Sequence, residues 1–244
     1  MAIYLKKFEN HTQYENYING SEAILPNVSI CTTEGDVHYN PSTPTPTHDY
    51  VEIGGLKWAT MNVGANSITD YGLYFQWGDT QGYTASQVGS GEGQKYFGWA
   101  DYKYGNGTSS PGATGMTKYN STDGKTILDA SDDPVTAAWG GNWRTPTVSE
   151  FQALSEAVNI SWEQGIFTLV SKVDSSKKLV FPRGGYCFKG NSISTGSVGY
   201  YLSSSLNASQ SDKFYNLYFD NASVNWQSNI GRAIGLVVRG ILDE

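Results

Sequence analysis

The chain contains 244 residues, with 23 acidic against 16 basic side chains and a formal net charge of −7. Only 16% of the residues are charged and 14% are aromatic, a composition that excludes a disordered chain and a coiled coil. No stretch approaches 18 apolar residues, so no membrane-spanning helix is predicted. The excess of acids argues against binding to the phosphates of nucleic acids.

Residues 41–49 mark a division of the chain. Three prolines between positions 41 and 46 favour extended polyproline geometry and forbid a helix. We therefore predict a linker over 41–49, between an N-terminal segment of residues 1–40 and a domain of residues 50–244.

The N-terminal segment is predicted to hold a short helix over 10–20 and two short strands, near 28–31 and 37–39. Forty residues bury too little surface to be stable alone, so we expect this segment to pack on a sister chain, on another protein or on the main domain. No apolar stretch typical of a secretory signal follows Met1, so no such signal is expected in the sequence as given. Cys31 and Cys187 are too few for a disulfide scaffold and are expected to be free, buried thiols.

The domain of residues 50–244 has the pattern of short strands joined by Gly, Ser, Asn and Asp turns. One helix is well signalled, because Thr147 and Glu150 form a capping box and apolar residues recur behind it at helical spacing. The segment 82–125 is rich in Gly, Ser, Thr and Tyr and is expected to form long loops. The predicted fold class is α+β, with short strands, few helices and extensive ordered loops. Strands are predicted at 56–59, 73–77, 167–170, 179–181, 214–219 and 236–239.

Three ordered blocks of this domain resemble a known family. They are Trp58–Asp79, Asp132–Glu150 and Gly199–Arg239. Together they resemble the bacterial major paralogous domain and the formylglycine-generating-enzyme branch of the C-type lectin fold, over about residues 50–241. The resemblance implies a C-type lectin-like fold. The sequence departs from the family pattern at Met61, where a Cys is common. It also departs at several positions of the last block, where Leu202 replaces an expected Trp.

Members of this fold serve as the variable proteins of diversity-generating retroelements, with varied residues near the carboxyl terminus. Residues 196–234 contain eight Ser, five Asn, four Tyr and three Gly against four charged residues, a mixture that resembles a binding surface rich in rigid Tyr and adaptable polar groups. Adenine-directed variation of AAC codons cannot produce Gln, Lys or Trp, which excludes Gln210, Lys213, Trp226 and Gln227. The predicted ligand-binding residues are Tyr200, Leu202, Asn207, Ser209, Asp212, Tyr218, Asp220, Asn225, Asn229, Arg232 and Ile234.

Enzyme classes are disfavoured by the residues that are missing. The chain has three histidines, His11, His38 and His48, and all lie in or before the linker. A three-His iron site and a Ser–His–Asp arrangement are therefore not expected in the main domain. Cys187 is the only thiol of this domain, so a Cys pair is not expected either. We predict no catalytic residues, no metal site and no cofactor.

Three further polar motifs have structural interpretations. Glu150 is expected to cap the helix, and Arg144 to bond carbonyls or a carboxylate inside the fold. Asp132 and Asp133 are expected to lie in a loop before a turn at Trp139, because no further oxygen ligands follow with calcium-site spacing. The calcium-binding triplets of sugar-binding C-type lectins are missing as well.

These observations predict a non-enzymatic recognition protein that binds a cell-surface protein or glycan receptor through residues 200–236. The most specific version is a phage receptor-binding (tail-tip) variable protein on the virion surface, docked on the virion or on sister chains through residues 1–40, with homo-oligomer formation as one expectation. A bacterial cell-surface adhesin and a structural virion component without a ligand are the alternatives.

Overall fold

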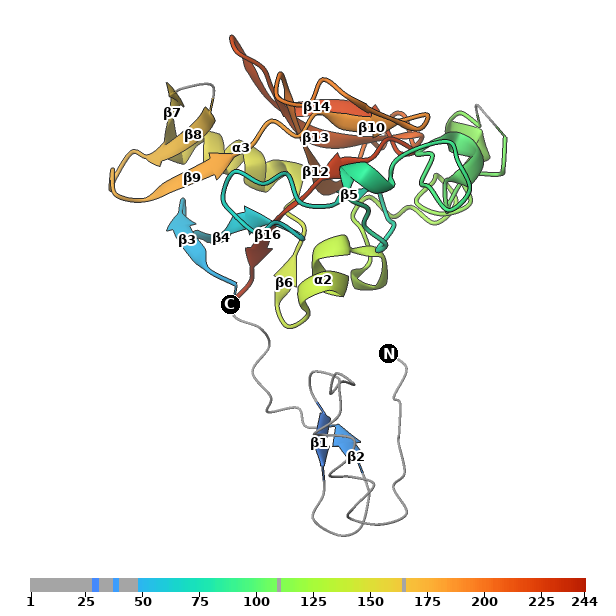
Figure 1. The fold of residues 1–244 in the computed structure, drawn as a ribbon, viewed down its shortest axis with the longest axis horizontal. Helices are drawn as coiled ribbons and strands as arrows, with labels where there is room; N and C mark the ends of the chain where they lie inside the picture. Colours follow the sequence, from blue (N-terminus) through green and yellow to red (C-terminus); the bar gives the residue numbers. More distant parts are fainter. Residues whose placement is uncertain (1–27, 31–36, 40–47, 109–110, 164–165) are drawn as a thin grey trace. The chain divides into compact units, whose positions relative to one another are not determined.

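The computed structural model describes residues 28–30, 37–39, 48–108, 111–163 and 166–244. The chain divides into two compact units, Met1–Thr47 and His48–Glu244, and this division falls within the predicted linker. In the first unit, β1 (Val28–Ile30) and β2 (Val37–Tyr39) lie where two short strands are predicted, and they pair antiparallel (Figure 1). The helix predicted over 10–20 lies outside the described residues, as do the thiol of Cys31 and the docking contacts predicted for residues 1–40.

The second unit is a mixed α+β domain made mostly of sheets, with few helices, which confirms the coarse fold class. Its largest sheet has five strands in the order β14-β13-β12-β15-β5, and all neighbours are antiparallel except β12 and β15. We call it the central sheet (Figure 1). Its strands are β5 (Tyr74–Phe75), β12 (Gly199–Leu206), β13 (Lys213–Phe219), β14 (Val224–Gly231) and β15 (Leu236–Val237).

Two smaller sheets and a hairpin complete the second unit. A four-stranded sheet has the order β3-β4-β16-β6, and a three-stranded sheet has the order β7-β8-β9. The strands of these sheets and of the hairpin are β3 (Tyr50–Ile53), β4 (Leu56–Asn62), β6 (Trp143–Arg144), β7 (Val158–Glu163), β8 (Ile166–Ser171), β9 (Lys178–Phe181), β10 (Tyr186–Phe188), β11 (Asn191–Ile193) and β16 (Arg239–Leu242).

Within the described residues, no helix is long and apolar enough to cross a membrane.

Helix α3 (Val148–Ala157) begins where the capping box predicts. The Thr147 hydroxyl accepts a hydrogen bond from the Glu150 amide at 3.3 Å, and the Glu150 carboxylate accepts from the Thr147 amide at 2.7 Å. Phe151 and Leu154 are buried on one side of the helix, which packs against β13 and β14. The helix is shorter than its apolar pattern suggests, because Val158 is extended and starts β7.

Two hydrophobic clusters cover the two faces of the central sheet. The helix-side core joins Tyr201, Leu217 and Phe219 of this sheet to Phe151 of α3 and Phe167 of β8. The loop-side core joins side chains of the opposite face to apolar residues of the segment 77–128. It includes Trp77, Tyr119, Leu128, Leu202, Leu206, Phe214 and Leu236. The central strand β12 is therefore covered on both faces, and its burial pattern has little of the alternation seen in a strand with one wet face.

The segment 82–125 is largely irregular, as predicted, apart from single 3-10 turns at Ala85–Gln87, Trp99–Asp101 and Ala113–Gly115. Aromatic contacts hold part of it to the central sheet, since the Tyr119 ring packs edge-on against Trp77 at 5.0 Å and Tyr102 donates to the Trp77 carbonyl at 2.8 Å. Residues of this segment between 113 and 125 form one wall of a groove that is described below.

Helix α2 (Pro134–Trp139) corrects the loop predicted around Asp132 and Asp133. Asp133 is its N-cap and accepts from the amides of Val135 and Thr136, while Pro134 occupies the first turn, where it sacrifices no hydrogen bond. The structure also corrects the position expected for His48. This residue belongs to the second unit, and its ring stacks on Trp139 at 4.1 Å.

Candidate functional site

The predicted binding residues separate into three levels of exposure along β12–β14 and the turns that join these strands. Ser209, Asn225 and Asn229 are exposed. Three members are buried and cannot contact a ligand: Leu202, Asn207 and Arg232. The half-buried members are Tyr200, Asp212, Tyr218, Asp220 and Ile234.

Leu202 and Asn207 are buried for different reasons. Leu202 lies at the centre of β12, pairs with Asn216 and belongs to the loop-side core with no exposed surface. Asn207 shapes the turn after β12, because its side-chain oxygen accepts from the Ser209 amide at 3.1 Å and its backbone amide donates to Lys213. The prediction that Leu202 and Asn207 lie on a binding surface is wrong, because both side chains are buried.

Arg232 is fully buried and ties the long loops to the central sheet. Its guanidinium donates to the Tyr102 hydroxyl at 2.8 Å and to the carbonyls of Lys118, Tyr119 and Ser211 at 2.9 to 3.2 Å. These partners come from segments that are far apart in the chain, so Arg232 acts as a clamp. Its predicted role in ligand contact is therefore also wrong.

Three tyrosines from three strands form an aromatic row, which we call the tyrosine row: Tyr186 on β10, Tyr200 on β12 and Tyr218 on β13. The Tyr186 and Tyr200 ring centroids are 5.4 Å apart, and those of Tyr200 and Tyr218 are 4.8 Å apart. Tyr200 and Tyr218 are direct cross-strand partners, and Asn225 of β14 is the next partner in line. All three tyrosines are half-buried, so part of each residue is accessible to solvent.

The turn between β13 and β14 is held by Asp220. Its carboxylate accepts from the amides of Ala222 and Ser223 at 2.8 Å and from the Tyr218 hydroxyl at 2.9 Å. These hydrogen bonds lower the pKa of Asp220 to about 2, so the carboxylate is ionised at neutral pH. The hydrogen bond to Asp220 raises the pKa of Tyr218, and burial raises that of Tyr200, so both phenols are neutral hydrogen-bond donors. Asp220 fixes one end of the tyrosine row.

Strand β14 is an edge of the central sheet and alternates between exposed and half-buried residues. Asn225, Gln227 and Asn229 are the exposed members. The Gln227 side chain is engaged, because its oxygen accepts from Gln152 of α3 at 2.9 Å. The Asn225 side-chain oxygen accepts from the Gln227 backbone amide at 3.0 Å, which leaves its NH2 group unpaired among the described residues, and the Asn229 side chain has no partner among them.

Part of the polar composition that suggested a binding surface is structural. Ser203, Ser204 and Ser205 of β12 are buried. The Ser204 amide donates to the Pro146 carbonyl at 2.8 Å, and the Ser205 hydroxyl accepts from the Val148 amide at 3.0 Å. These serines fasten β12 to the start of α3, so they contribute rigidity and no contact surface.

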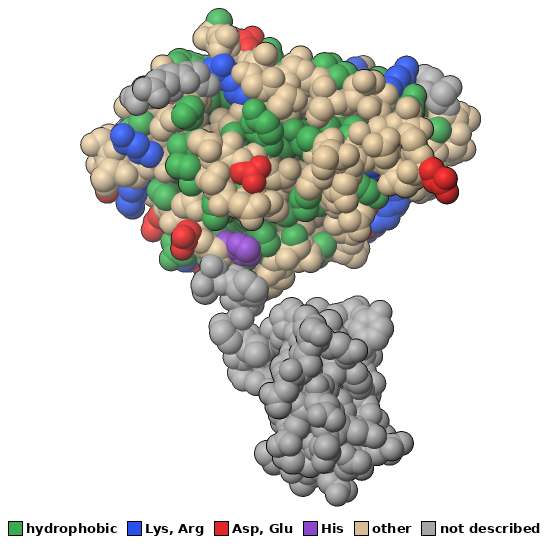
Figure 2. Space-filling view, viewed as in Figure 1, with side chains coloured by type: hydrophobic (Ala, Val, Ile, Leu, Met, Phe, Trp, Pro, Cys, Tyr) green, Lys and Arg blue, Asp and Glu red, His purple; other side chains and the backbone are tan. Residues whose placement is uncertain are grey.

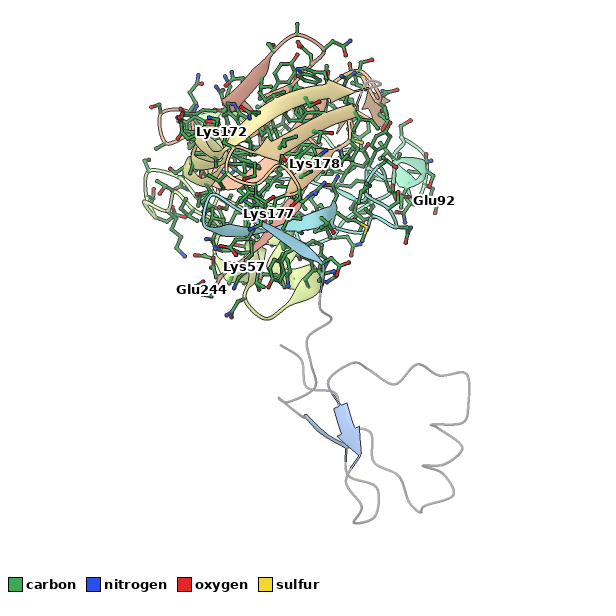
Figure 3. All side chains as sticks on the ribbon, turned by 90° about the vertical axis from the view of Figure 1, so that its left-hand side faces the viewer. Lys57, Glu92, Lys172, Lys177, Lys178 and Glu244 are labelled. Atoms are coloured by element: carbon green, nitrogen blue, oxygen red, sulfur yellow. The ribbon has the colours of Figure 1, made fainter. Side chains whose placement is uncertain are left out.

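Apart from Asp220, the charged groups described here form their ion pairs away from the tyrosine row. Arg144 forms hydrogen bonds to Glu150 at 2.6 and 2.9 Å and to Asp243 at 2.6 Å, as expected of an internal partner. Figure 2 shows most charged side chains near the rim of one face. Figure 3 shows lysines gathered on another side, at the turn between β8 and β9. The labelled ones at this turn are Lys172, Lys177 and Lys178, whereas Lys57 lies on β4 beside Glu244.

Metal-binding clusters, thiols and buried carboxylates are the features of the described residues that bear on catalysis. No group of three or more His, Cys, Asp or Glu side chains among them is arranged to hold a metal ion. Cys187 is free and buried, and burial raises the pKa of its thiol to about 11, which keeps it protonated and unreactive at neutral pH. Asp133 is a buried carboxylate, but helix and strand amides surround it in a capping role.

Tyr186 is the member of the candidate site that sequence reasoning missed. It lies before the stretch 196–234, and the short strand β10 was not predicted. Its proximity to Tyr200 arises from non-local packing, and the only hint in the sequence is an aromatic residue directly after the glycine pair Gly184 and Gly185. No family model matches the chain, and no curated protein or solved structure matches it either.

Proposed function

We propose that this chain is a non-enzymatic recognition protein with a C-type lectin-like fold, which binds a receptor through the tyrosine row and the exposed residues of β14. The most specific form of the proposal is a phage receptor-binding variable protein, diversified by a retroelement and carried on the virion surface. The mixed α+β architecture, with few helices and long ordered loops, is the kind of fold that the resemblance implies.

The observation that carries the proposal is the tyrosine row beside uncharged amide groups on a hydrogen-bonded ladder. Tyr200, Tyr218 and Asn225 lie in one register across three strands. Tyrosines supply large contact area with little conformational freedom to lose, and Asn side chains supply adaptable hydrogen bonds. Because the backbone is already fixed, binding loses less entropy than it would on a mobile loop.

The separation of exposed and buried residues explains how such a surface can vary. An exchange at exposed Asn225 or Asn229 is expected to change stability by within about 0.5 kcal/mol, whereas truncation of buried Leu202 costs about 2–5 kcal/mol. Since total stability is about 5–15 kcal/mol, several surface exchanges are tolerable and several core exchanges are not.

Binding to intact bacterial cells tests recognition. A panel of strains is incubated with the full chain and with a variant carrying Tyr200→Ser, Tyr218→Ser and Asn225→Ala. We expect wild type to bind at least one strain and the variant to lose binding while keeping its circular dichroism spectrum. A control with Ser175→Ala, an exposed residue of the turn between β8 and β9, should bind like wild type. Wild type that binds no strain would overturn the recognition function and favour a structural role.

A genomic observation tests the retroelement. The proposal predicts a second copy of the codons for about residues 200–240 near the gene, differing from it only at adenines, beside a reverse-transcriptase gene. The buried positions Leu202, Asn207 and Arg232 should be identical in both copies, and exposed positions should carry the differences. A neighbourhood without that repeat would remove the diversified form of the proposal and leave the recognition function to the binding assay.

A further inference from the structure

A groove of about 440 Å³, lined by both polar and apolar groups, lies at the other end of β12 and β13 from the turn held by Asp220. One wall comes from the loops around 113–126, and the other from the turn after β12, residues 206–211. Its volume falls within the range of small-molecule binding sites. Ser209, one of the predicted binding residues, lines it, whereas the tyrosine row does not.

The walls of this groove are held together before any ligand arrives. The Leu206 amide donates to the Thr126 carbonyl at 2.8 Å, and the Ser211 hydroxyl donates to the Ala113 carbonyl at 3.1 Å. Arg232 adds a third connection, because it donates to the Ser211 carbonyl and to the loop at Tyr119. The groove is therefore pre-formed, which reduces the cost of binding.

Four hydroxyl groups line the groove with their hydrogen-bonding capacity free: those of Thr114, Ser121, Thr126 and Ser209. Within the described part of the chain, none of these hydroxyls has a hydrogen-bond partner. A hydroxyl both donates and accepts, and it rotates to suit its partner. Four of them on two facing walls form an adaptable set for a ligand that itself carries hydroxyls.

The ionic groups of the groove are already neutralised. Lys125 holds the Asp129 carboxylate with two hydrogen bonds of 2.6 and 2.8 Å. The Asn120 amide is also occupied, since it donates to the Met116 carbonyl and accepts from Thr122. No carboxylate lines the groove. An anion would find no free cation among the described lining residues, and a metal cation would find no charged oxygen ligand.

We propose that this groove binds a neutral saccharide. The four hydroxyls would exchange hydrogen bonds with sugar hydroxyls, while Leu206 and Ala208 would contact the apolar C–H groups of the ring. This inference rests on the proposed function, because it names the chemical class of the receptor and a second contact region for it. It adds a calcium-independent sugar contact, built from side-chain hydroxyls, to the tyrosine row.

Titration followed by NMR tests the groove directly. The full chain is titrated with methyl glycosides of glucose, galactose, mannose and N-acetylglucosamine, and with glucuronic acid as an anionic comparison. We expect at least one neutral glycoside to shift the amide signals of residues 206–211 and 113–126, and the acid to bind more weakly. If no neutral glycoside shifts these signals, or if the acid binds more tightly, the inference is wrong.

A matched pair of variants locates the site. Ser209→Trp places a large ring in the groove mouth, while Ser175→Trp adds the same ring at another exposed turn. We expect saccharide affinity to fall at least about tenfold only in the first, a loss of about 1.4 kcal/mol. Equal affinity in both variants would place the sugar elsewhere and overturn the assignment.

Cell binding separates the two proposals. If cells are bound through the tyrosine row while no saccharide enters the groove, recognition stands and the groove inference falls. If saccharides bind but wild type binds no cell, the groove inference stands and the proposed function falls.

Discussion

Arg232→Ala is predicted to be strongly destabilising, because Arg232 is fully buried and joins the long loops to the central sheet. The guanidinium makes four hydrogen bonds of 2.8 to 3.2 Å, and three of its four acceptors are backbone carbonyls of Lys118, Tyr119 and Ser211. Hydrogen bonds to a charged donor contribute about 1.5–3 kcal/mol each, so four of them set an upper bound of about 6–12 kcal/mol. Water that enters the space left behind recovers part of this.

We expect a net loss of about 3–5 kcal/mol in the free energy of unfolding, a large share of a typical total. For a domain of this size that loss lowers the melting temperature by roughly 6–20 °C. The Arg232 guanidinium also lies 4.7 Å from the Trp77 ring, so the tryptophan emission should shift as water reaches this ring. Asn229→Ala, at an exposed residue of the edge strand β14, is the control and should stay within about 0.5 kcal/mol of wild type.

Urea unfolding followed by tryptophan fluorescence measures this difference. The seven tryptophans all lie at or after position 58, so the signal reports on the second unit. Arg232→Lys should be nearly as destabilising as Arg232→Ala, because an ammonium cannot reproduce the planar fork that reaches several acceptors. The clamp would be refuted if Arg232→Ala unfolded at the urea concentration of Asn229→Ala.

Three further outcomes follow from buried groups. Burial raises the pKa of Asp132, but hydrogen bonds from Lys118 and its neighbours outweigh this effect and hold the pKa well below the usual range. The ionised carboxylate therefore stabilises the fold fully above about pH 4, and this stabilisation is lost as pH falls through the native pKa. Asp132→Asn should thus lower the free energy of unfolding by about 1.5–3 kcal/mol at pH 7. In urea titrations at lower pH, the difference in this free energy between wild type and variant should become smaller, and a difference that stays constant would contradict the assignment. The buried Asn216 side-chain oxygen has no partner among the described residues, so Asn216→Leu should be neutral or stabilising by up to about 1 kcal/mol in thermal melts, and a loss above about 2 kcal/mol would reveal a partner. In a Cys31→Ser variant, the remaining thiol, Cys187, should react with a disulfide reagent only after unfolding, and rapid reaction of the native protein at pH 8 would disprove its burial.

The elements that could be predicted from the sequence are those with local signals. The capping box at Thr147 specifies the start of α3 without help from the rest of the chain. The apolar runs of β8, β9 and β13 identify strands because their side chains alternate or are buried on both faces. Helix α2 was missed although Asp133 and Pro134 are a cap and a first-turn proline, because six residues show no helical period.

The candidate site was predictable only in part, for a physical reason. Exposure at Asn225 and Asn229 follows from alternation along one strand, which is a local property. Burial of Arg232 depends on carbonyls contributed by loops more than a hundred residues earlier, and such partners leave no local pattern. The proximity of Tyr186 to Tyr200 is likewise non-local. Composition alone could not distinguish the fastening serines of β12 from a contact surface.

A pair of displayed libraries measures whether exposed positions of β12–β14 and their turns accept substitutions that buried positions do not. One library randomises exposed or half-buried Tyr200, Ser209, Asn225 and Asn229 with NNC codons, and the other randomises buried Leu202, Asn207 and Arg232 in the same way. The measurement is the fraction of members that resist protease at a temperature below the wild-type melting point. We expect most members of the first library and few members of the second to stay folded. Equal survival in both libraries would contradict it.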